Sequence, residues 1–214
     1  MTTPFSRIGA RKRAQGVEPG RLPPGQYVLR GWPVLHYGRV PAFDERSWDL
    51  RISGATASGE QAVLDWSDVE ALPRTDVQAD FHCVTKFSVL GSTWTGVSVT
   101  ELLRRCPPAD EVSHVMVWAE HGYSANLRIA DVAAPSTMLV THRDGERLTP
   151  EHGYPLRLLV PHLYGWKGPK WVREVEYLTE DRRGFWEERG YHNLADPWRE
   201  QRYSFQEAPG EGPP

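Results

Sequence analysis

One cysteine stands out as a residue that could do chemistry. Cys83 lies beside His82 at the end of a predicted strand, and polar residues and glycine follow it. These surroundings are typical of a turn at the top of a strand rather than of a core. The nearby cations Lys86 and His82 would favour the thiolate, which is the form of cysteine that attacks a substrate or binds a metal. The residues alone leave three roles open for Cys83: a buried structural thiol, a metal ligand or a nucleophile.

The spacing of the possible ligands disfavours zinc. The sequence contains no C-x-x-C pair and no H-E-x-x-H motif, and no second cysteine lies near Cys83. The other cysteine, Cys106, ends a predicted amphipathic helix on the same face as Leu102 and Leu103, so we interpret it as a small buried apolar residue. A cysteine–histidine hydrolase stays open as an alternative, because any of the 8 histidines could be the partner.

A second group of functional side chains lies in the segment EHGYPLRLLVPHLYGWKGPKW, residues 151–171. It places four basic residues around a glycine-containing loop whose backbone N–H groups could face an anion: His152, Arg157, Lys167 and Lys170. The segment is not a P-loop, since G-x-x-x-x-G-K-[ST] has no match. A strand and turn with solvated charges is the alternative interpretation.

The elements that must position these residues are mostly short strands. Alternation of apolar and polar residues, or short runs of β-formers, predicts strands over 48–53, 115–118, 137–141, 156–161 and 171–178. Asp144-Gly145 is a sequence typical of a type I′ hairpin turn.

Helices are few and short in the predicted pattern. Ser67 with Glu70 forms a capping box for a helix that ends at 72–73, and Ser98 with Glu101 forms one for a helix over 99–106. There is no internal repeat and no βαβ alternation. The sequence therefore predicts a β-rich α+β domain rather than a doubly wound sheet.

Length and charge limit the architecture and the partners. The 214 residues suit one domain, since a single core keeps growing to about 250–300 residues. We expect an N-terminal arm over 1–25, the domain over 26–204 and a flexible tail over 205–214. The 25 basic and 28 acidic residues are mixed along the chain, so nucleic acid is not an expected partner. No apolar run has the length of a signal peptide or a membrane span, so we expect a cytoplasmic protein whose two cysteines stay reduced.

The two groups of functional residues together resemble the molybdopterin-dependent oxidoreductase family that includes sulfite oxidase and the catalytic subunit of the periplasmic methionine-sulfoxide reductase. Three blocks occur in the family's order: Cys83 with Trp94 and Gly96 after it, then HGYPLRLLVP, then YGWKGPKW. The segments GQYVLRGWPVLHYGRVP and GFWEERGYHNLADPWREQRY also resemble a short cytoplasmic subgroup, the sulfite oxidase-like oxidoreductases. The resemblance implies a single-domain sulfite oxidase-type molybdopterin-binding fold.

The resemblance implies that Cys83 is the one protein thiolate on a molybdenum ion, or on tungsten in its place. The two sulfurs of a pyranopterin dithiolene complete the soft ligands, so one cysteine suffices where zinc would need several. The phosphate and pterin of the cofactor require cations and backbone amides, and Arg157 and Lys170 would carry most of the charge neutralisation. The implied cofactor-binding positions are His36, Tyr37, Cys83, His152, Arg157, Lys167, Gly168, Pro169 and Lys170.

Tyr123 falls where sulfite oxidases keep a tyrosine close to the metal. The resemblance implies a catalytic role for it beside Cys83, as a hydrogen-bonding or proton-transfer group; a tyrosine in an ordinary turn is the alternative. Sulfite oxidases also hold the sulfite dianion with arginines, and here Leu35 and Ser88 stand at those positions. Because a pocket without those cations would hold a dianion poorly, we do not expect sulfite as the physiological substrate.

The expected function is therefore two-electron oxygen-atom transfer between a molybdenum pyranopterin and a small substrate. The haem and dimerisation domains of the eukaryotic enzymes have no counterpart, so a separate electron carrier is expected, with no membrane insertion. The alternatives are a cysteine–histidine hydrolase, a catalytically inert pterin-binding module and a β-rich interaction domain. The direction of the reaction, the metal, the carrier and the oligomeric state are not determined by the sequence.

Overall fold

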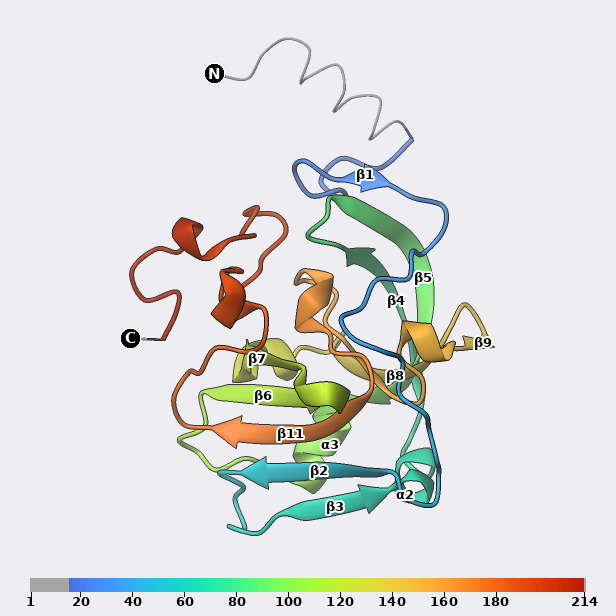
Figure 1. The fold of residues 1–214 in the computed structure, drawn as a ribbon, viewed down its shortest axis with the longest axis vertical. Coiled ribbons are helices and arrows are strands. Elements are labelled where there is room, and N and C mark those ends of the chain that lie inside the picture. The colour runs from blue at the N-terminus through green and yellow to red at the C-terminus, as the bar shows by residue number, and fades with distance from the viewer. Residues whose placement is uncertain (1–15, 214) are drawn as a thin grey trace.

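The computed structural model describes residues 16–213, which form two sheets with short helices around them (Figure 1). The first sheet has the order β1-β5-β8-β10, with β4 paired to β5 and β9 to β8. Its strands are β1 (Tyr27–Val28), β4 (Thr75–His82), β5 (Phe87–Ser98), β8 (Met138–Arg143), β9 (Glu146–Arg147) and β10 (Arg157–Leu159). All of its pairings are antiparallel except that of β1 with β5.

The second sheet has the order β3-β2-β11-β6-β7. Its strands are β2 (Asp49–Gly54), β3 (Ala62–Asp65), β6 (His114–Ala119), β7 (Ser124–Arg128) and β11 (Val172–Leu178). Only β2 and β11 pair in parallel. The predicted β-rich α+β class, without a doubly wound sheet, is confirmed.

The largest hydrophobic core lies between the two sheets. Leu50 and Ile52 of β2 are fully buried while Asp49, Arg51 and Ser53 are not, which is the alternation that the sequence predicts. The same core includes side chains of β10, β11 and the helix α3. Burial of one face of each sheet against the other therefore fixes the strands that carry the functional side chains.

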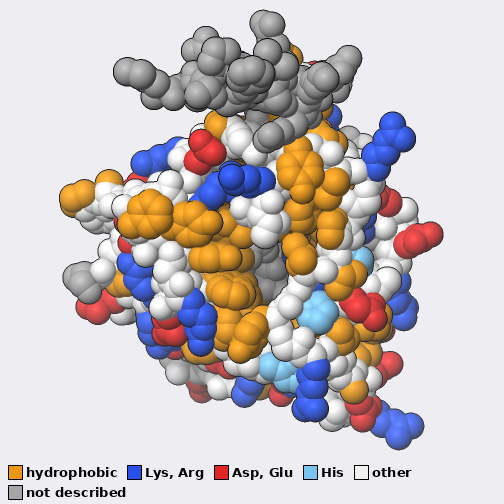
Figure 2. Space-filling view, turned by 45° about the horizontal axis from the view of Figure 1, so that its top comes forward, with side chains coloured by type: hydrophobic (Ala, Val, Ile, Leu, Met, Phe, Trp, Pro, Cys, Tyr) orange, Lys and Arg blue, Asp and Glu red, His pale blue; other side chains and the backbone are white. Residues whose placement is uncertain are grey.

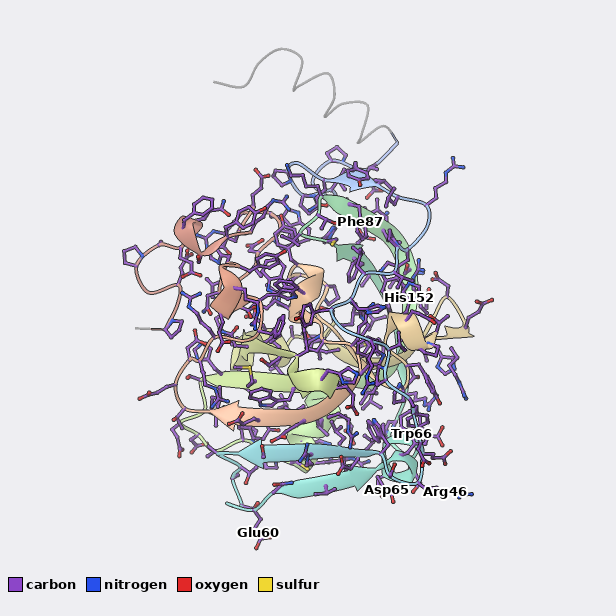
Figure 3. All side chains as sticks on the ribbon, in the orientation of Figure 1. Arg46, Glu60, Asp65, Trp66, Phe87 and His152 are labelled. Carbon is purple, nitrogen blue, oxygen red and sulfur yellow. The ribbon has the colours of Figure 1, made fainter. Side chains whose placement is uncertain are left out.

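Within residues 16–213 the helices are α2 (Trp66–Glu70), α3 (Val99–Arg105) and α4 (Ile129–Val132), with five 3₁₀ turns: η1 (Glu120–Gly122), η2 (Pro150–His152), η3 (Gly165–Lys167), η4 (Glu187–Arg189) and η5 (Ser204–Gln206). Both predicted helices exist, but both predicted capping boxes are wrong. The helix α2 is capped by Asp65, whose carboxylate accepts from the Asp68 backbone N–H, and Figure 3 labels Asp65 and Trp66 at this start. At α3 the Ser98 side chain makes no cap bond, because its hydroxyl is hydrogen-bonded to the Thr100 hydroxyl at 2.7 Å.

The hairpin between β8 and β9 confirms the predicted turn. Asp144 and Gly145 have φ of 53° and 81°, and Arg143 pairs with Glu146 on either side of them. Positive φ at both central residues defines the type I′ turn.

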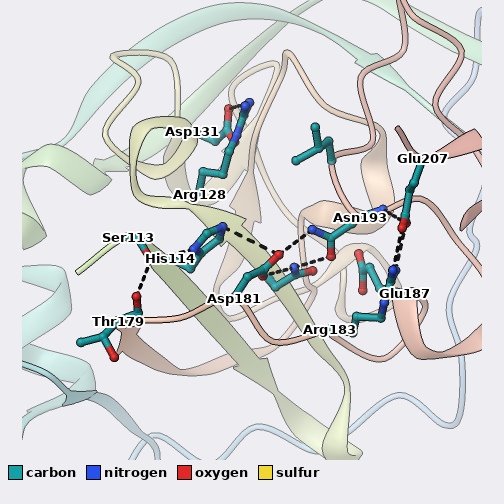
Figure 4. Close-up of polar contacts among 12 residues, drawn as sticks. Ser113, His114, Arg128, Asp131, Thr179, Asp181, Arg183, Glu187, Asn193 and Glu207 are labelled. Atoms are coloured by element: carbon teal, nitrogen blue, oxygen red, sulfur yellow. Dashed lines mark hydrogen bonds and ion pairs between the residues drawn. The ribbon is translucent and has the colours of Figure 1, made fainter. Parts of the chain in front are cut away.

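The structure describes almost all of the C-terminal segment but not the first 15 residues. Residues 1–15 of the predicted N-terminal arm lie outside the described residues. Near the C-terminus, Glu207 accepts from the Arg183 guanidinium and from the Asn193 backbone N–H (Figure 4), so this segment is tied to the domain by hydrogen bonds. Across residues 16–213, no helix has the length and apolar character needed to cross a membrane.

Candidate functional site

A cleft of about 270 Å³ brings most of the predicted site residues together. Figure 2 shows a hollow on the face of the molecule where apolar side chains gather. The turn between β4 and β5 forms one part of the wall, and η2, η3 and the segment 32–37 form others. The predicted residues that line it are His36, Tyr37, Cys83, Tyr123, His152, Arg157, Gly168, Pro169 and Lys170.

Cys83 lies in the tight turn that joins β4 to β5, as its polar neighbours predict. Its backbone N–H donates to Phe87 O at 2.9 Å, and the Lys86 N–H donates to Cys83 O at 3.0 Å. Lys86 closes the turn with a φ of 78°, which is unusual for a residue with a side chain. The Thr85 hydroxyl donates to Cys83 Sγ at 3.1 Å. The turn thus holds a half-buried thiol at the wall of the cleft.

Arg157 supplies a buried cation to the cleft from the start of β10. Its side chain is only 3% exposed, its guanidinium lies 5.0 Å from the Trp32 ring centroid, and Nη1 donates to His152 O at 3.1 Å. Burial lowers the pKa of Arg157 to about 10, so the group stays cationic at neutral pH. Its Nε has no hydrogen-bond partner among the described residues, which leaves a buried donor for a ligand to satisfy.

Lys170 is a second cation beside Arg157. A side chain at Gly153, whose φ is 113°, would come within 3.1 Å of the Cβ atoms of both Arg157 and Lys170, so glycine allows the two chains to approach. Burial, and then the charge of Arg157, lower the pKa of Lys170 to about 7. Within residues 16–213 no carboxylate forms an ion pair with either cation. Two adjacent cations without an ion-pair partner indicate a site for an anion.

We predict that anion binding here depends on pH through Lys170. Sulfate, whose own charge is constant over this range, should bind the cofactor-free protein about tenfold more weakly at pH 8 than at pH 6, because Lys170 loses its proton near pH 7. The affinity can be measured by isothermal titration calorimetry. In Lys170→Met the affinity should be low at both pH values, and an unchanged pH profile in that variant would contradict the assignment.

Lys167, predicted to bind the cofactor, faces away from the cleft. Its ammonium donates to Asn126 O and Oδ1, both at 2.8 Å, and lies 2.7 Å from Glu187 Oε1. Both members of this ion pair are fully buried, and Lys167 is absent from the cleft lining. Its charge is therefore neutralised inside the protein, and we remove it from the ligand-binding set.

Tyr123 lines the cleft, and its hydroxyl proton is used in a hydrogen bond within the protein. The phenol donates to Trp166 O at 2.6 Å. Burial raises its pKa well above the ordinary value, so the group stays a neutral hydroxyl. Toward a ligand, its oxygen can accept a hydrogen bond.

The three remaining predicted side chains form walls. The ring of His152 stacks on Trp32 at 4.2 Å between centroids, with Nε2 3.1 Å from Trp32 O, and burial lowers its pKa. His36 and Tyr37 are exposed at the mouth, where Tyr37 packs against Phe185. Gly168 cannot carry a side chain, because a Cβ there would lie 2.4 Å from Leu158 O.

Two residues expected near a substrate lie in different environments. Leu35 lines the mouth of the cleft, whereas Ser88 is fully buried outside it, with its hydroxyl 2.8 Å from His82 Nδ1. Phe87, labelled with His152 in Figure 3, takes the cleft position next to Ser88. His82 is buried and does not line the cleft. Neither it nor any other histidine of the described residues hydrogen-bonds to Cys83.

Sequence reasoning missed the aromatic residues that form much of the wall. Their spacing along the chain gives no signal, since a buried aromatic residue of the core and one of a cleft look alike in sequence. The aromatic residues added by the structure are Trp32, Phe81, Phe87, Trp186 and Tyr191, while Trp166 and Trp171 belong to the segment 151–171 that the sequence already predicts as part of the site.

Comparison with known proteins gives one consistent result. The model of the oxidoreductase molybdopterin binding domain matches residues 37–186. Uncharacterized oxidoreductase YuiH of Bacillus subtilis is 40% identical, over 91% of this chain and 98% of that protein. The putative protein-methionine-sulfoxide reductase subunit YedZ1 of Azospira oryzae is 28% identical, over 79% of this chain and 64% of that protein. The crystal structure of the sulfane dehydrogenase SoxCD from Paracoccus pantotrophus shares the fold, with a TM-score of 0.59 and 22% identity over 66% of this chain and 40% of that one.

Proposed function

Because the chain belongs to the family of molybdopterin-binding oxidoreductases, we propose that it is an oxygen-atom transfer enzyme with Cys83 as the protein ligand of a molybdenum pyranopterin. The observation that carries the proposal is one cleft that holds a thiol and two cations with no ion-pair partner among the described residues. The proposed reaction moves two electrons and one oxygen atom: an oxide takes up two electrons and two protons to give the reduced substrate and water, or the reverse occurs.

The residues of the cleft fit this cofactor. A phosphate oxygen or a pterin acceptor would accept a hydrogen bond from the unpaired Arg157 Nε. The negative charge of a phosphate would also reduce the repulsion between Arg157 and Lys170. Gly153 allows the Arg157 and Lys170 side chains to lie close together, and Gly168 allows its segment to pack against Leu158 O. Cys83 offers the soft sulfur that a dithiolene-bound metal takes from the protein.

When bound, the cofactor would supply the redox chemistry, and the chain would supply binding, orientation and a dry environment. Arg157 and Lys170 would neutralise its charge, while His152 stacked on Trp32 would form a rigid wall. Tyr123, with its proton held by Trp166 O, would accept a hydrogen bond close to the reacting atoms. We propose that a separate electron carrier serves the cofactor, since two electrons must leave or arrive in each turnover.

The cysteine–histidine hydrolase gains no support from the geometry, since no described histidine is bonded to Cys83. An inert pterin-binding module would have the same cleft, and only turnover distinguishes it from an enzyme.

Metal analysis by mass spectrometry tests the proposal. The protein would be purified from a host that makes molybdopterin. About one molybdenum ion per chain is expected. Tungsten in the same amount would support the same type of oxygen-atom transfer with a different metal. A folded sample with neither metal would contradict the proposal.

Sulfite is predicted to be a poor substrate. The mouth of the cleft presents Leu35, which is 52% exposed, and no free cation at that position to hold a dianion. Leu35→Arg should therefore raise kcat/KM for sulfite by at least about tenfold, the effect of one charge-assisted contact of roughly 1.5 kcal/mol. Leu35→Gln, which adds polarity without charge, is the control, and equal rates for the two variants would contradict the reasoning.

A further inference from the structure

The turn that carries Cys83 presents three carbonyl groups to the protein behind it, those of Cys83, Val84 and Lys86. The turn has one internal backbone hydrogen bond, from Lys86 N–H to Cys83 O, and its last residue has the unfavourable positive φ. Such a turn needs support from outside to keep one conformation. The support comes from two segments that are far from Cys83 in sequence.

The first support is Gln26, just before β1. Its side chain is 3% exposed, and Nε2 donates to Cys83 O at 3.0 Å. The strand that follows pairs in parallel with β5, and the Tyr27 N–H donates to Lys86 O at 2.9 Å. The segment therefore contacts both ends of the turn.

The second support is Arg202, near the C-terminus. It is 5% exposed, and Nη1 donates to Val84 O at 2.7 Å. Its guanidinium lies 4.8 Å from the centroid of the Tyr164 ring, and its nearest carboxylate, Glu200, is 3.7 Å away. A buried guanidinium with so weak an ion pair is held mainly by the carbonyl and the ring that it contacts.

The backbone around Arg202 is itself anchored. The Arg202 carbonyl accepts from the His192 N–H at 3.1 Å, and the Arg202 N–H donates to Gln206 Oε1 at 2.9 Å. Tyr191, next to His192, lines the cleft. The C-terminal segment thus reaches both the wall of the cleft and the back of the turn.

We propose that Gln26 and Arg202 are positioning residues that fix the Cys83–Lys86 turn from behind and so set the direction of the Cys83 sulfur. Both lie outside residues 37–186, the part that matches the family domain. The segments on both sides of the matched domain therefore contribute the residues that hold the Cys83–Lys86 turn. The inference rests on the proposed function only in taking Cys83 as the metal ligand, and the contacts can be tested without the cofactor.

Hydrogen exchange measured by mass spectrometry on the cofactor-free full chain is the direct test. The Lys86 amide is hydrogen-bonded within the turn and the Cys83 amide to Phe87 O at the start of β5, so both amides should exchange faster if the turn is loosened. In Arg202→Met we expect roughly tenfold faster exchange at these amides, since a charged donor is lost, and about fivefold in Gln26→Leu. Arg202→Lys, which keeps a cationic donor, should recover part of the protection.

Matched controls separate positioning from general stability. Arg199→Met removes an arginine that is exposed and paired with Glu211, and Gln78→Leu changes an exposed glutamine of β4. Both should leave the turn unchanged. Unchanged exchange in Arg202→Met and Gln26→Leu, or an equal increase in β6 and β11, would overturn the proposal.

The loaded enzyme gives a second readout. In Arg202→Met the metal content should stay stoichiometric, while the electron paramagnetic resonance spectrum of the half-reduced metal changes and kcat falls with KM unchanged. A wild-type protein without metal would contradict the proposed function, yet the exchange experiment would still decide the positioning role. A wild-type spectrum in Arg202→Met would overturn the positioning role alone.

Discussion

Replacing Cys83 by serine is expected to lower turnover by more than about 100-fold while the protein stays folded, since changes outside the ligand shell of a metal already cost 10–100-fold. A serine hydroxyl is a harder donor than a thiolate and stays protonated at neutral pH, so it is a poor replacement on a soft dithiolene-bound metal. Cys83 is half-buried in a turn, so the change leaves the core intact. Turnover with a reduced viologen dye as electron donor, together with circular dichroism, measures both effects.

Cys106→Ser is the matched control. Cys106 follows α3 and packs against the main core, and burial raises the pKa of its thiol, so it is neither in the cleft nor primed to react. Its replacement should leave turnover close to that of the wild type. Retained activity in Cys83→Ser would remove Cys83 from the mechanism, whatever the control shows.

Replacing Lys167 by methionine is expected to destabilise the protein by about 3–5 kcal/mol, the usual cost of removing one partner of a buried ion pair. The change leaves the Glu187 carboxylate buried beside the Trp166 indole, with no cation to balance it. Asn126 loses both hydrogen bonds from the ammonium. Urea unfolding followed by tryptophan fluorescence gives the change in the free energy of unfolding.

Two further variants make this result specific. Arg104→Met breaks an exposed pair with Glu101, and pairs of that kind contribute little, so its unfolding midpoint should barely move. The double variant Lys167→Met with Glu187→Leu removes both charges and should recover much of the lost stability. A single Lys167→Met variant as stable as the wild type would contradict a structural role for this pair.

Patterns in the sequence are enough to predict the available chemistry and the local elements of secondary structure. Alternation along 48–53 gave a strand whose apolar residues are buried, because a period of two places every second side chain on one face. The pair Asp144-Gly145 gave its hairpin, because a type I′ turn needs positive φ at both positions. The motif blocks around Cys83 and 152–170 predicted the family, which the domain match confirms, while the assignment of each site residue stays a prediction.

The directions of the functional side chains depend on tertiary contacts. Lys167 and Lys170 are three residues apart, yet Glu187 and Asn126 hold the first inside the protein while the second lines the cleft. Ser88 is likewise buried outside the cleft, where its hydroxyl is hydrogen-bonded to His82. Sequence periodicity records contacts within one element, whereas these directions depend on partners that folding brings from distant parts of the chain. Gln26 and Arg202 meet the Cys83 turn for the same reason: 57 and 118 residues separate them from the carbonyls that they hold.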